Sequence, residues 1–167
     1  MAKVDTWEFT RKQAHPKARA RLDKAFYWNE GDDHSPLGND TGRDTARSYR
    51  DWCSDRRRAG VRRFLEQLMQ GWALADTDWD LLDAERLQGQ LPQDGYQILT
   101  RDDMVIGLAF TQMILEGKVD PEVQRVALLA VQRQSLDVVI AFREWDNPKK
   151  RKTRLEHMRA VLTLDWS

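Results

Sequence analysis

The segment from Phe26 to Trp52, FYWNEGDDHSPLGNDTGRDTARSYRDW, runs from an aromatic cluster through a polar loop into a helix. Gly38 and Gly42 suit the turns of such a loop, because glycine adopts positive φ at little cost. Either Asp40 or Thr41 is a suitable cap for the helix. The expected buried face of this helix consists of Ala46, Tyr49, Trp52 and Cys53. We therefore expect a structured polar loop that locks two helices together.

Apolar residues at helical spacing predict the neighbouring elements. A helix begins at His15-Pro16 and ends at Trp28, and residues 1–13 form an arm or a short strand. The basic residues at 56–58 are typical of the C-terminal end of the helix after the loop. The next helix has the clearest apolar seam, made of Val61, Phe64, Leu65, Leu68, Met69 and Trp72.

Capping and turn patterns divide the middle of the chain. Thr77 with Asp80 forms a capping-box pattern, which predicts a short helix through Leu87. Residues 89–96, GQLPQDGY, have the composition of a turn and predict a loop.

The same patterns predict the helices of the C-terminal half. Thr100 with Asp103 repeats the capping box before residues 104–116, which are apolar nearly all round and predict a central helix. Further helices follow the prolines at 121 and 148, with Ser135 as a candidate cap between them. Residues 1–167 are thus expected to form one all-α domain, an irregular bundle of about six or seven helices.

Composition limits the function classes. The formal net charge is zero, so no global field attracts nucleic acid or anionic lipid. The single cysteine, Cys53, excludes an internal disulfide and indicates a reducing compartment, and we expect it to be buried and inert. The N-terminus lacks the apolar core of a signal peptide, and no apolar run approaches the roughly 20 residues of a membrane span. We expect a cytoplasmic protein.

The polar loop is one candidate ligand site. Its potential ligands are Asp32, Asp33, His34, Asn39, Asp40 and Asp44. A calcium loop needs alternating ligands and a final glutamate, and a zinc site needs several His or Cys residues. Neither pattern is present, so we favour a structural loop and predict no metal or cofactor. A binding site in this loop remains the alternative hypothesis.

Two oppositely charged segments follow the loop. Residues 43–63 carry a row of arginines, a candidate nucleic-acid face, although no aromatic–basic pattern of a known module accompanies it. An acidic segment comes next and contains Asp76, Asp78, Asp80, Asp83 and Trp79. Complementary patches of this kind favour intramolecular pairing or a protein partner over nucleic acid. Trp7, Trp79 and Trp166 lie near the ends of elements, where we expect an indole to stay partly exposed.

The arrangement HPKARARLDKAFYW, GDDHSPLGNDTGRDT and YRDW resembles the YfeS-like family of small bacterial proteins over residues 15–72. The later IGLAF and VQRQ are similar but less specific. Leu37 stands where the family more often has phenylalanine, which changes volume rather than chemistry. The resemblance implies a bacterial cytoplasmic protein with no assigned reaction, so no catalytic residue is carried over.

A non-enzymatic, protein-binding function fits these patterns best. The chain has no GxSxG elbow, P-loop or GxGxxG motif, and we assign no catalytic residue. The sharpest hypothesis is a bacterial immunity or antitoxin-like protein that blocks a toxin through Trp79 and the acidic segment. An enzyme or ligand-binding protein using the Asp32–Asp44 loop and a nucleic-acid binder using Arg43–Arg63 are the alternatives.

Overall fold

A computed structural model describes residues 7–55 and 59–167, and this part of the chain is helical with no β-strand. The α-helices are α1 (Pro16–Arg21), α2 (Asp40–Ser54), α3 (Val61–Gly71), α4 (Ala84–Glu116), α5 (Pro121–Gln134), α6 (Asp137–Arg143) and α7 (Pro148–Leu162). Two short 3-10 helices, η1 (Arg11–Gln13) and η2 (Ala25–Trp28), lie near the N-terminus. The prediction of an irregular all-α bundle is confirmed.

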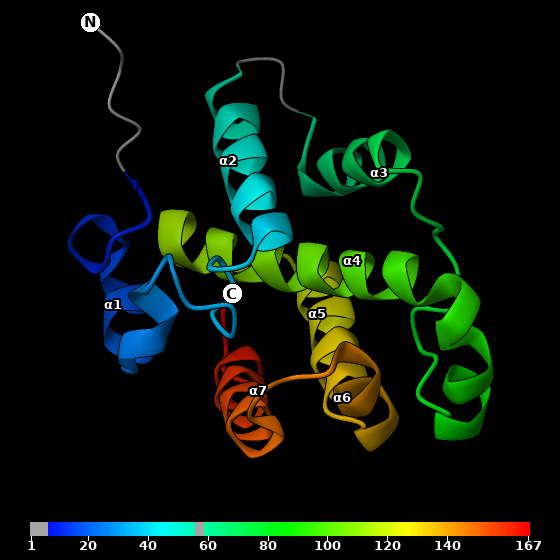
Figure 1. The fold of residues 1–167 in the computed structure, drawn as a ribbon. Helices are drawn as coiled ribbons and strands as arrows, with labels where there is room; N and C mark the ends of the chain where they lie inside the picture. The colour runs from blue at the N-terminus through cyan, green and yellow to red at the C-terminus, as the bar shows by residue number, and fades with distance from the viewer. Residues whose placement is uncertain (1–6, 56–58) are drawn as a thin grey trace, which may run out of the picture.

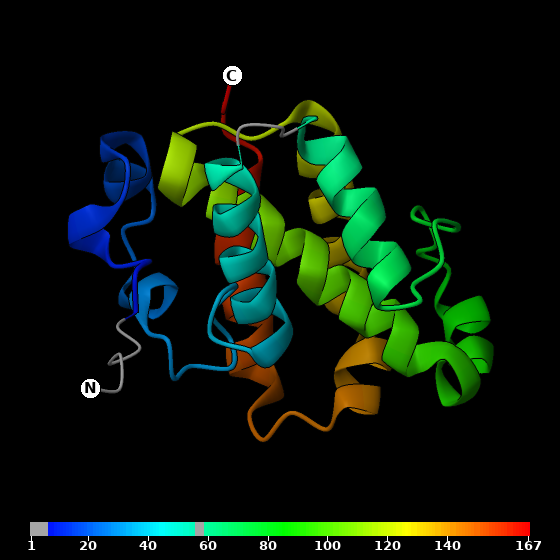
Figure 2. The ribbon, with the colours of Figure 1, turned by 90° about the horizontal axis from the view of Figure 1, so that it is seen from above.

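Helix α4 is the central element, 33 residues long. Figures 1 and 2 show α2 and α3 on one side of α4 and α5, α6 and α7 on the other. Every residue from Arg101 to Ile114 is buried, because α4 is covered on both sides over this stretch. The predicted central helix is therefore correct, although it begins much earlier than residue 104.

One glycine lets α4 approach α2 closely, and another lets the polar loop approach α2. An ideal Cβ built on Gly107 of α4 would lie 2.9 Å from the Cα of Gly42 in α2. A Cβ on Gly42 itself would collide with the carbonyl oxygen of Pro36 in the polar loop. The loop, the first turn of α2 and the middle of α4 therefore meet backbone to backbone.

The predictions for residues 77–103 were wrong at three places. Residues 77–83 form no helix, and α4 begins after Asp83, whose side chain caps it by accepting from the backbone N–H of Arg86 at 3.0 Å. The predicted loop 89–96 is helical, and Thr100 and Asp103 lie inside the helix rather than at its start. Packing overrides the turn composition here, because this stretch buries Leu91, Gly95 and Leu99.

Pro92 lies inside α4, where it cannot donate to the ladder and its ring crowds the preceding turn. The first part of α4 bends away from the axis of the rest, at the right of Figure 1, as proline in a helix predicts. An ideal Cβ at Gly95 would lie 2.6 Å from the ring of Phe142 in α6, so this glycine lets α6 pack against the bent part. The bend opens space beside the segment that precedes α4.

Other predictions need smaller corrections. The first helix ends at Arg21, and Phe26 belongs to η2. Asn39, rather than Asp40 or Thr41, caps α2 by accepting from the backbone N–H of Gly42 at 2.7 Å. Trp166 is 1% exposed, not partly exposed, because its indole donates to the Val161 carbonyl from within the core.

Cys53 is half-buried, with its Sγ 3.9 Å from Oε1 of Glu116, so the expectation of full burial was wrong. The basic residues at 56–58, predicted to end a helix, lie outside the described residues. No helix in the described ranges has the length and apolar character that crossing a membrane requires.

Candidate functional site

Residues 73–83, which we call the acidic loop, connect α3 to α4 and carry every residue of the predicted partner surface. This loop contains four aspartates and no lysine or arginine. Asp76 accepts a hydrogen bond from the indole of Trp79 at 2.6 Å, and Asp83 caps α4. Asp78 and Asp80 are exposed, and Trp79 is half-buried. All four aspartates are thus exposed, and two of them, Asp76 and Asp83, also accept a local hydrogen bond.

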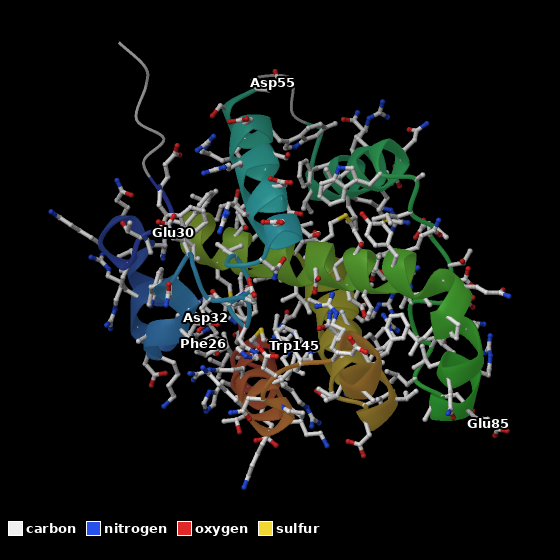
Figure 3. All side chains as sticks on the ribbon, viewed as in Figure 1. Phe26, Glu30, Asp32, Asp55, Glu85 and Trp145 are labelled. Atoms are coloured by element: carbon white, nitrogen blue, oxygen red, sulfur yellow. The ribbon has the colours of Figure 1, made fainter. Side chains whose placement is uncertain are left out.

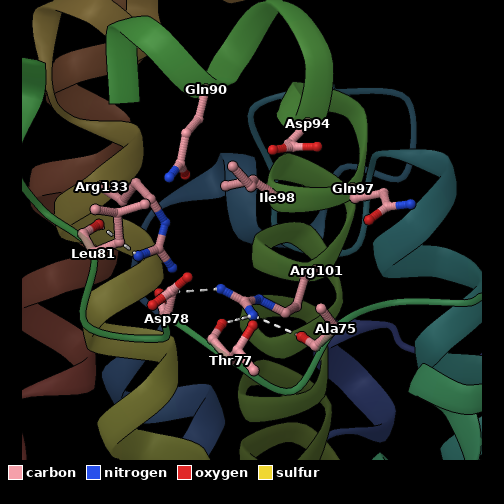
Figure 4. Close-up of a pocket in the computed structure, with 10 residues that line it drawn as sticks. All are labelled: Ala75, Thr77, Asp78, Leu81, Gln90, Asp94, Gln97, Ile98, Arg101 and Arg133. Carbon is pink, nitrogen blue, oxygen red and sulfur yellow. Dashed lines mark hydrogen bonds between the residues drawn. The ribbon is translucent and has the colours of Figure 1, made fainter. Parts of the chain in front are cut away.

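Arg101 of α4 binds the backbone of the acidic loop. The Nη1 of Arg101 donates to the carbonyl oxygen of Ala75 at 2.7 Å and to that of Thr77, and its Nη2 reaches the carbonyl oxygen of Asp78 at 3.4 Å. The guanidinium carbon also lies 4.1 Å from the ring centre of Trp79, which adds a cation–π contact. Figure 4 shows the hydrogen bonds from Arg101 to the loop backbone.

A second arginine holds the other half of the loop. The Nη1 of Arg133 in α5 donates to the carbonyl oxygens of Trp79 at 3.0 Å and Leu81 at 2.8 Å. Its Nε and Nη2 donate to both carboxylate oxygens of Asp102, at 3.0 and 2.6 Å. Both side chains of this ion pair are fully buried. A bidentate pair of this kind fixes the guanidinium in position, and the loop backbone with it.

Asp103, the next residue of α4, is linked to the polar loop through a chain of side-chain hydrogen bonds. It accepts from Gln134 of α5 at 2.9 Å and from Arg143 of α6 at 2.6 Å. Gln134 in turn accepts from Arg151 of α7 at 2.7 Å, and Arg151 donates to the carbonyl oxygen of His34 at 3.3 Å. Three adjacent residues, Arg101 to Asp103, thus connect α4 to both predicted sites.

Burial shifts the pKa values in this network. Desolvation raises the pKa of Asp102 to about 6, although the hydrogen bonds and charge of Arg133 oppose the shift. Desolvation likewise lowers the pKa of Arg151 to about 10, because Asp103 compensates its charge only in part. The pKa of His34 is lowered by burial and by the charge of Arg151. In each case burial disfavours the charged form of the side chain.

We expect the carboxyl group of Asp102 to titrate with a midpoint near pH 6 in the folded protein. The native state then binds this proton more tightly than the unfolded chain, where the pKa is about 3.8. Asp102 therefore adds stability at low pH that is lost as pH rises from about 4 to about 6. Carboxyl ¹³C NMR against pH, with Asp102→Asn to assign the resonance, measures the midpoint. A midpoint at or below the ordinary value would contradict the dominance of desolvation.

Two hollows flank the acidic loop. The first is a cavity of about 200 Å³ between the loop and the bent part of α4, with Arg101 and Arg133 in its wall. The second is a small apolar groove of about 40 Å³ between the loop, α3 and α5. Leu65, Met69, Val123, Val126 and Trp79 line this groove, and Asp76, Glu66, Asp120, Glu122 and Arg62 also border it. The loop therefore has a polar hollow and an apolar one.

The polar loop 29–39 turns its side chains toward its own backbone. Asp32 accepts from the backbone N–H of His34 at 2.9 Å, and Asn39 caps α2. A Cβ at Gly38 would collide with the Asp32 carbonyl oxygen, which explains the glycine. The His34 ring stacks on Trp145, with ring centres 4.5 Å apart, and Figure 3 labels Asp32 and Trp145. These contacts agree with a structural loop.

The remaining candidate ligands of that loop face solvent. Asp33, Asp40 and Asp44 are exposed. Within residues 7–55 and 59–167, no group of three or more His, Cys, Asp or Glu side chains could hold a metal ion. Ligand binding by this loop stays a hypothesis.

Several arginines of the 43–63 row make contacts within the protein. Arg43 donates to the carbonyl oxygen of Glu30 at 2.6 Å, Arg50 pairs with Glu8, and Arg62 pairs with Glu66 at 3.3 Å. Arg63 is exposed, and residues 56–58 are not described. None of these partners belongs to the acidic segment, so pairing between the two charged segments stays a prediction, as does nucleic-acid binding.

Sequence reasoning missed the residues that position the acidic loop. They are Arg101, Arg133 and Asp102, and the network of Asp103, Gln134, Arg143 and Arg151 that reaches the polar loop was missed as well. One signal was available: RDD at 101–103 directly precedes the most apolar helical stretch of the chain. Charges placed there need partners inside the fold. Comparisons with protein-family models, curated proteins and solved structures find no match for this chain.

Proposed function

We propose that this protein acts without catalysis, by binding a basic protein partner through the acidic loop. In the most specific form of the proposal, the partner is a bacterial toxin and the protein is its immunity or antitoxin-like inhibitor. The supporting observation is the double arginine clamp, which fixes the loop backbone while Asp78 and Asp80 face solvent.

This arrangement is costly for stability alone. Four like charges in one short loop repel each other, and two guanidiniums are removed from water to hold the backbone. A rigid loop, however, loses little conformational entropy when a partner binds. A fixed group of carboxylates also accelerates encounter with a basic surface. The geometry therefore suits recognition better than it suits folding.

The apolar groove beside Trp79 supports the same surface. A half-buried tryptophan next to an apolar groove is the kind of residue on which partner side chains dock, and acidic residues border this groove. A basic partner side chain with an apolar stem, such as arginine or lysine, fits such surroundings. Trp79 also contacts Arg101, so the exposed aspartates give the cleaner test.

Asp78→Asn with Asp80→Asn is expected to weaken partner binding by roughly tenfold and to make the affinity less sensitive to salt. The partner is first captured from the bacterial host with the wild-type protein and identified by mass spectrometry. Its affinity for each variant is then measured at several salt concentrations. Asp23→Asn with Glu156→Gln is the matched control, since both residues are exposed, lie outside the loop and remove the same charge.

The toxin form of the proposal has its own readout. Co-expression of the wild-type protein should rescue cells from the captured partner, and the loop variant should rescue them less well than the control variant. Equal binding and equal rescue by the loop and control variants would contradict the proposal for this surface.

A further inference from the structure

Arg101 and Arg133 each bind the acidic loop through Nη1, but their Nε/Nη2 edges have different partners. Each directs Nη1 at two loop carbonyl oxygens. Arg133 gives Nε and Nη2 to the carboxylate of Asp102. Within the described residues, the same edge of Arg101 has no carboxylate: Nη2 makes only the 3.4 Å bond to Asp78, and Nε has no hydrogen-bond partner.

The unpaired edge is buried. Arg101 is 5% exposed, so its Nε–H has lost water without gaining an acceptor. A buried donor without an acceptor destabilises the folded state, and more so when it belongs to a charged group. Such a group in a folded protein requires an explanation, and a ligand is one. The Nε atoms of Arg43, Arg151 and Arg154 also lack a partner, but among these four arginines Arg101 is the one in the wall of this cavity. In Arg133 the same edge binds a carboxylate, whose geometry it matches, so a carboxylate is the partner we infer.

Arg101 borders the polar cavity, and Figure 4 shows its guanidinium between the loop carbonyls and the bent part of α4. The cavity holds about 200 Å³, many times the roughly 10–15 Å³ that one water molecule needs. There is therefore room for a small organic molecule. The residues that line the cavity include Asp78, Asp94, Gln97 and Arg101.

The wall also carries negative charge. Asp78 from the loop and Asp94 from α4 border the same cavity as Arg101. A ligand that is only an anion is attracted by Arg101 and repelled by these two carboxylates. A ligand that is only a cation meets the reverse problem. A small molecule with one group of each sign complements both parts of the wall.

We propose that this cavity binds a small zwitterion of the amino-acid class. Its carboxylate lies against the Nε/Nη2 edge of Arg101, as Asp102 lies on Arg133, once the side chains that shield Nε from solvent have moved aside. Its ammonium group lies near Asp78 and Asp94. The ligand connects the acidic loop to α4 and so tightens the surface proposed for the partner. Its binding is a property of the isolated protein and does not depend on that partner.

Titration calorimetry of the isolated protein tests the proposal directly. The probes are glycine, alanine, serine, glutamate and lysine, with acetate and ethylammonium as molecules that carry only one of the two groups. At least one amino acid should bind with one-to-one stoichiometry and roughly tenfold or more tighter than acetate or ethylammonium. Absence of binding by every amino acid overturns the proposal, and so does acetate binding as tightly as the best amino acid.

Variants locate the site without disturbing the arginine clamp. Asp94→Asn should weaken amino-acid binding by roughly tenfold, whereas Glu85→Gln, an exposed carboxylate of α4 outside the cavity wall, should leave it unchanged. Gln97→Trp, which places a large side chain at an exposed position of the wall, should abolish binding while the protein stays folded. Wild-type affinity in both cavity variants overturns the assignment.

One further outcome has a different meaning. If no ligand binds and Asp94→Asn lowers the Tm more than Glu85→Gln does, the carboxylate of Asp94 occupies Arg101 in solution. A side chain of the protein then takes the place proposed for the ligand's carboxylate, and the proposal fails. Asp80 lies outside the cavity wall, so Asp80→Asn alone should weaken partner binding whether or not the cavity holds a ligand, and the two proposals fail separately.

Discussion

Replacing Arg133 with methionine is expected to lower the free energy of unfolding by about 3–5 kcal/mol at neutral pH. The change leaves the fully buried carboxylate of Asp102 without its only cationic hydrogen-bond donor among the described residues. It also removes the donor to the carbonyl oxygens of Trp79 and Leu81. Urea denaturation at equilibrium measures the loss.

The loss should depend on pH. Without Arg133, nothing opposes the desolvation of Asp102, and its folded-state pKa rises further. The native state of the variant then binds the proton more tightly than its unfolded chain does. Stability therefore increases as pH falls through that raised pKa, and the deficit should be smaller at about pH 5 than at about pH 7.

Two comparisons separate the ion pair from general effects of the substitution. Arg125→Met removes an exposed arginine of the same helix, paired with Glu122, and should cost less than about 1 kcal/mol. Arg133→Met combined with Asp102→Leu removes both buried charges and should recover a large part of the lost stability. A cost at Arg133 no larger than at Arg125 would contradict the role assigned to the pair.

The second large effect concerns the polar loop. Gly42→Ala is expected to destabilise the protein by about 1–3 kcal/mol or more, because its Cβ would collide with the carbonyl oxygen of Pro36. The obstacle is backbone on both sides, since the Cα of Gly42 also approaches Gly107 of α4. Neither a side-chain rotation nor a local shift of α2 relieves the collision without moving the loop.

Gly89→Ala provides the matched control. Gly89 lies inside α4 with nothing within 4 Å of an ideal Cβ. Alanine there should stabilise the protein by about 0.5–1 kcal/mol, because it favours the helix and adds no clash. Thermal and urea denaturation of the two variants should therefore move in opposite directions. Similar values for both would mean that the loop tolerates a shift that its backbone contacts exclude.

The polar loop and the acidic loop differed in how far their sequences predicted them. Asx chemistry at residues 29–42 is local, so the loop and the helix after it could be predicted from neighbouring residues. The positive φ expected of Gly38 and Gly42 was wrong, because both are glycine to avoid a collision between a Cβ and a loop carbonyl oxygen. The capping box at Thr77 and Asp80 was equally local and was wrong. Arg101 and Arg133, far along the chain, bind the carbonyl groups that a helix there would have used.

The long central helix was missed in its first half for a related reason. GQLPQDGY contains two glycines and a proline, and local rules predict a turn. Leu91 and Leu99 instead bury themselves against Leu81, Leu87 and Val139, and the helix continues through Pro92 with a bend. The buried charges at 101–103 were visible in the sequence, but their partners were not. Those of Asp102 and Asp103 lie 31 to 40 residues further along, and those of Arg101 lie 23 to 26 residues earlier.

The two arginine clamps come from different helices, so the acidic loop depends on α4 and α5 being assembled against each other. A chain in which these helices have not yet docked has the same aspartates but no means of arranging them. Recognition would thus be reserved for fully folded molecules. A partner that selects this arrangement would in turn protect the folded state, by an amount set by its own concentration.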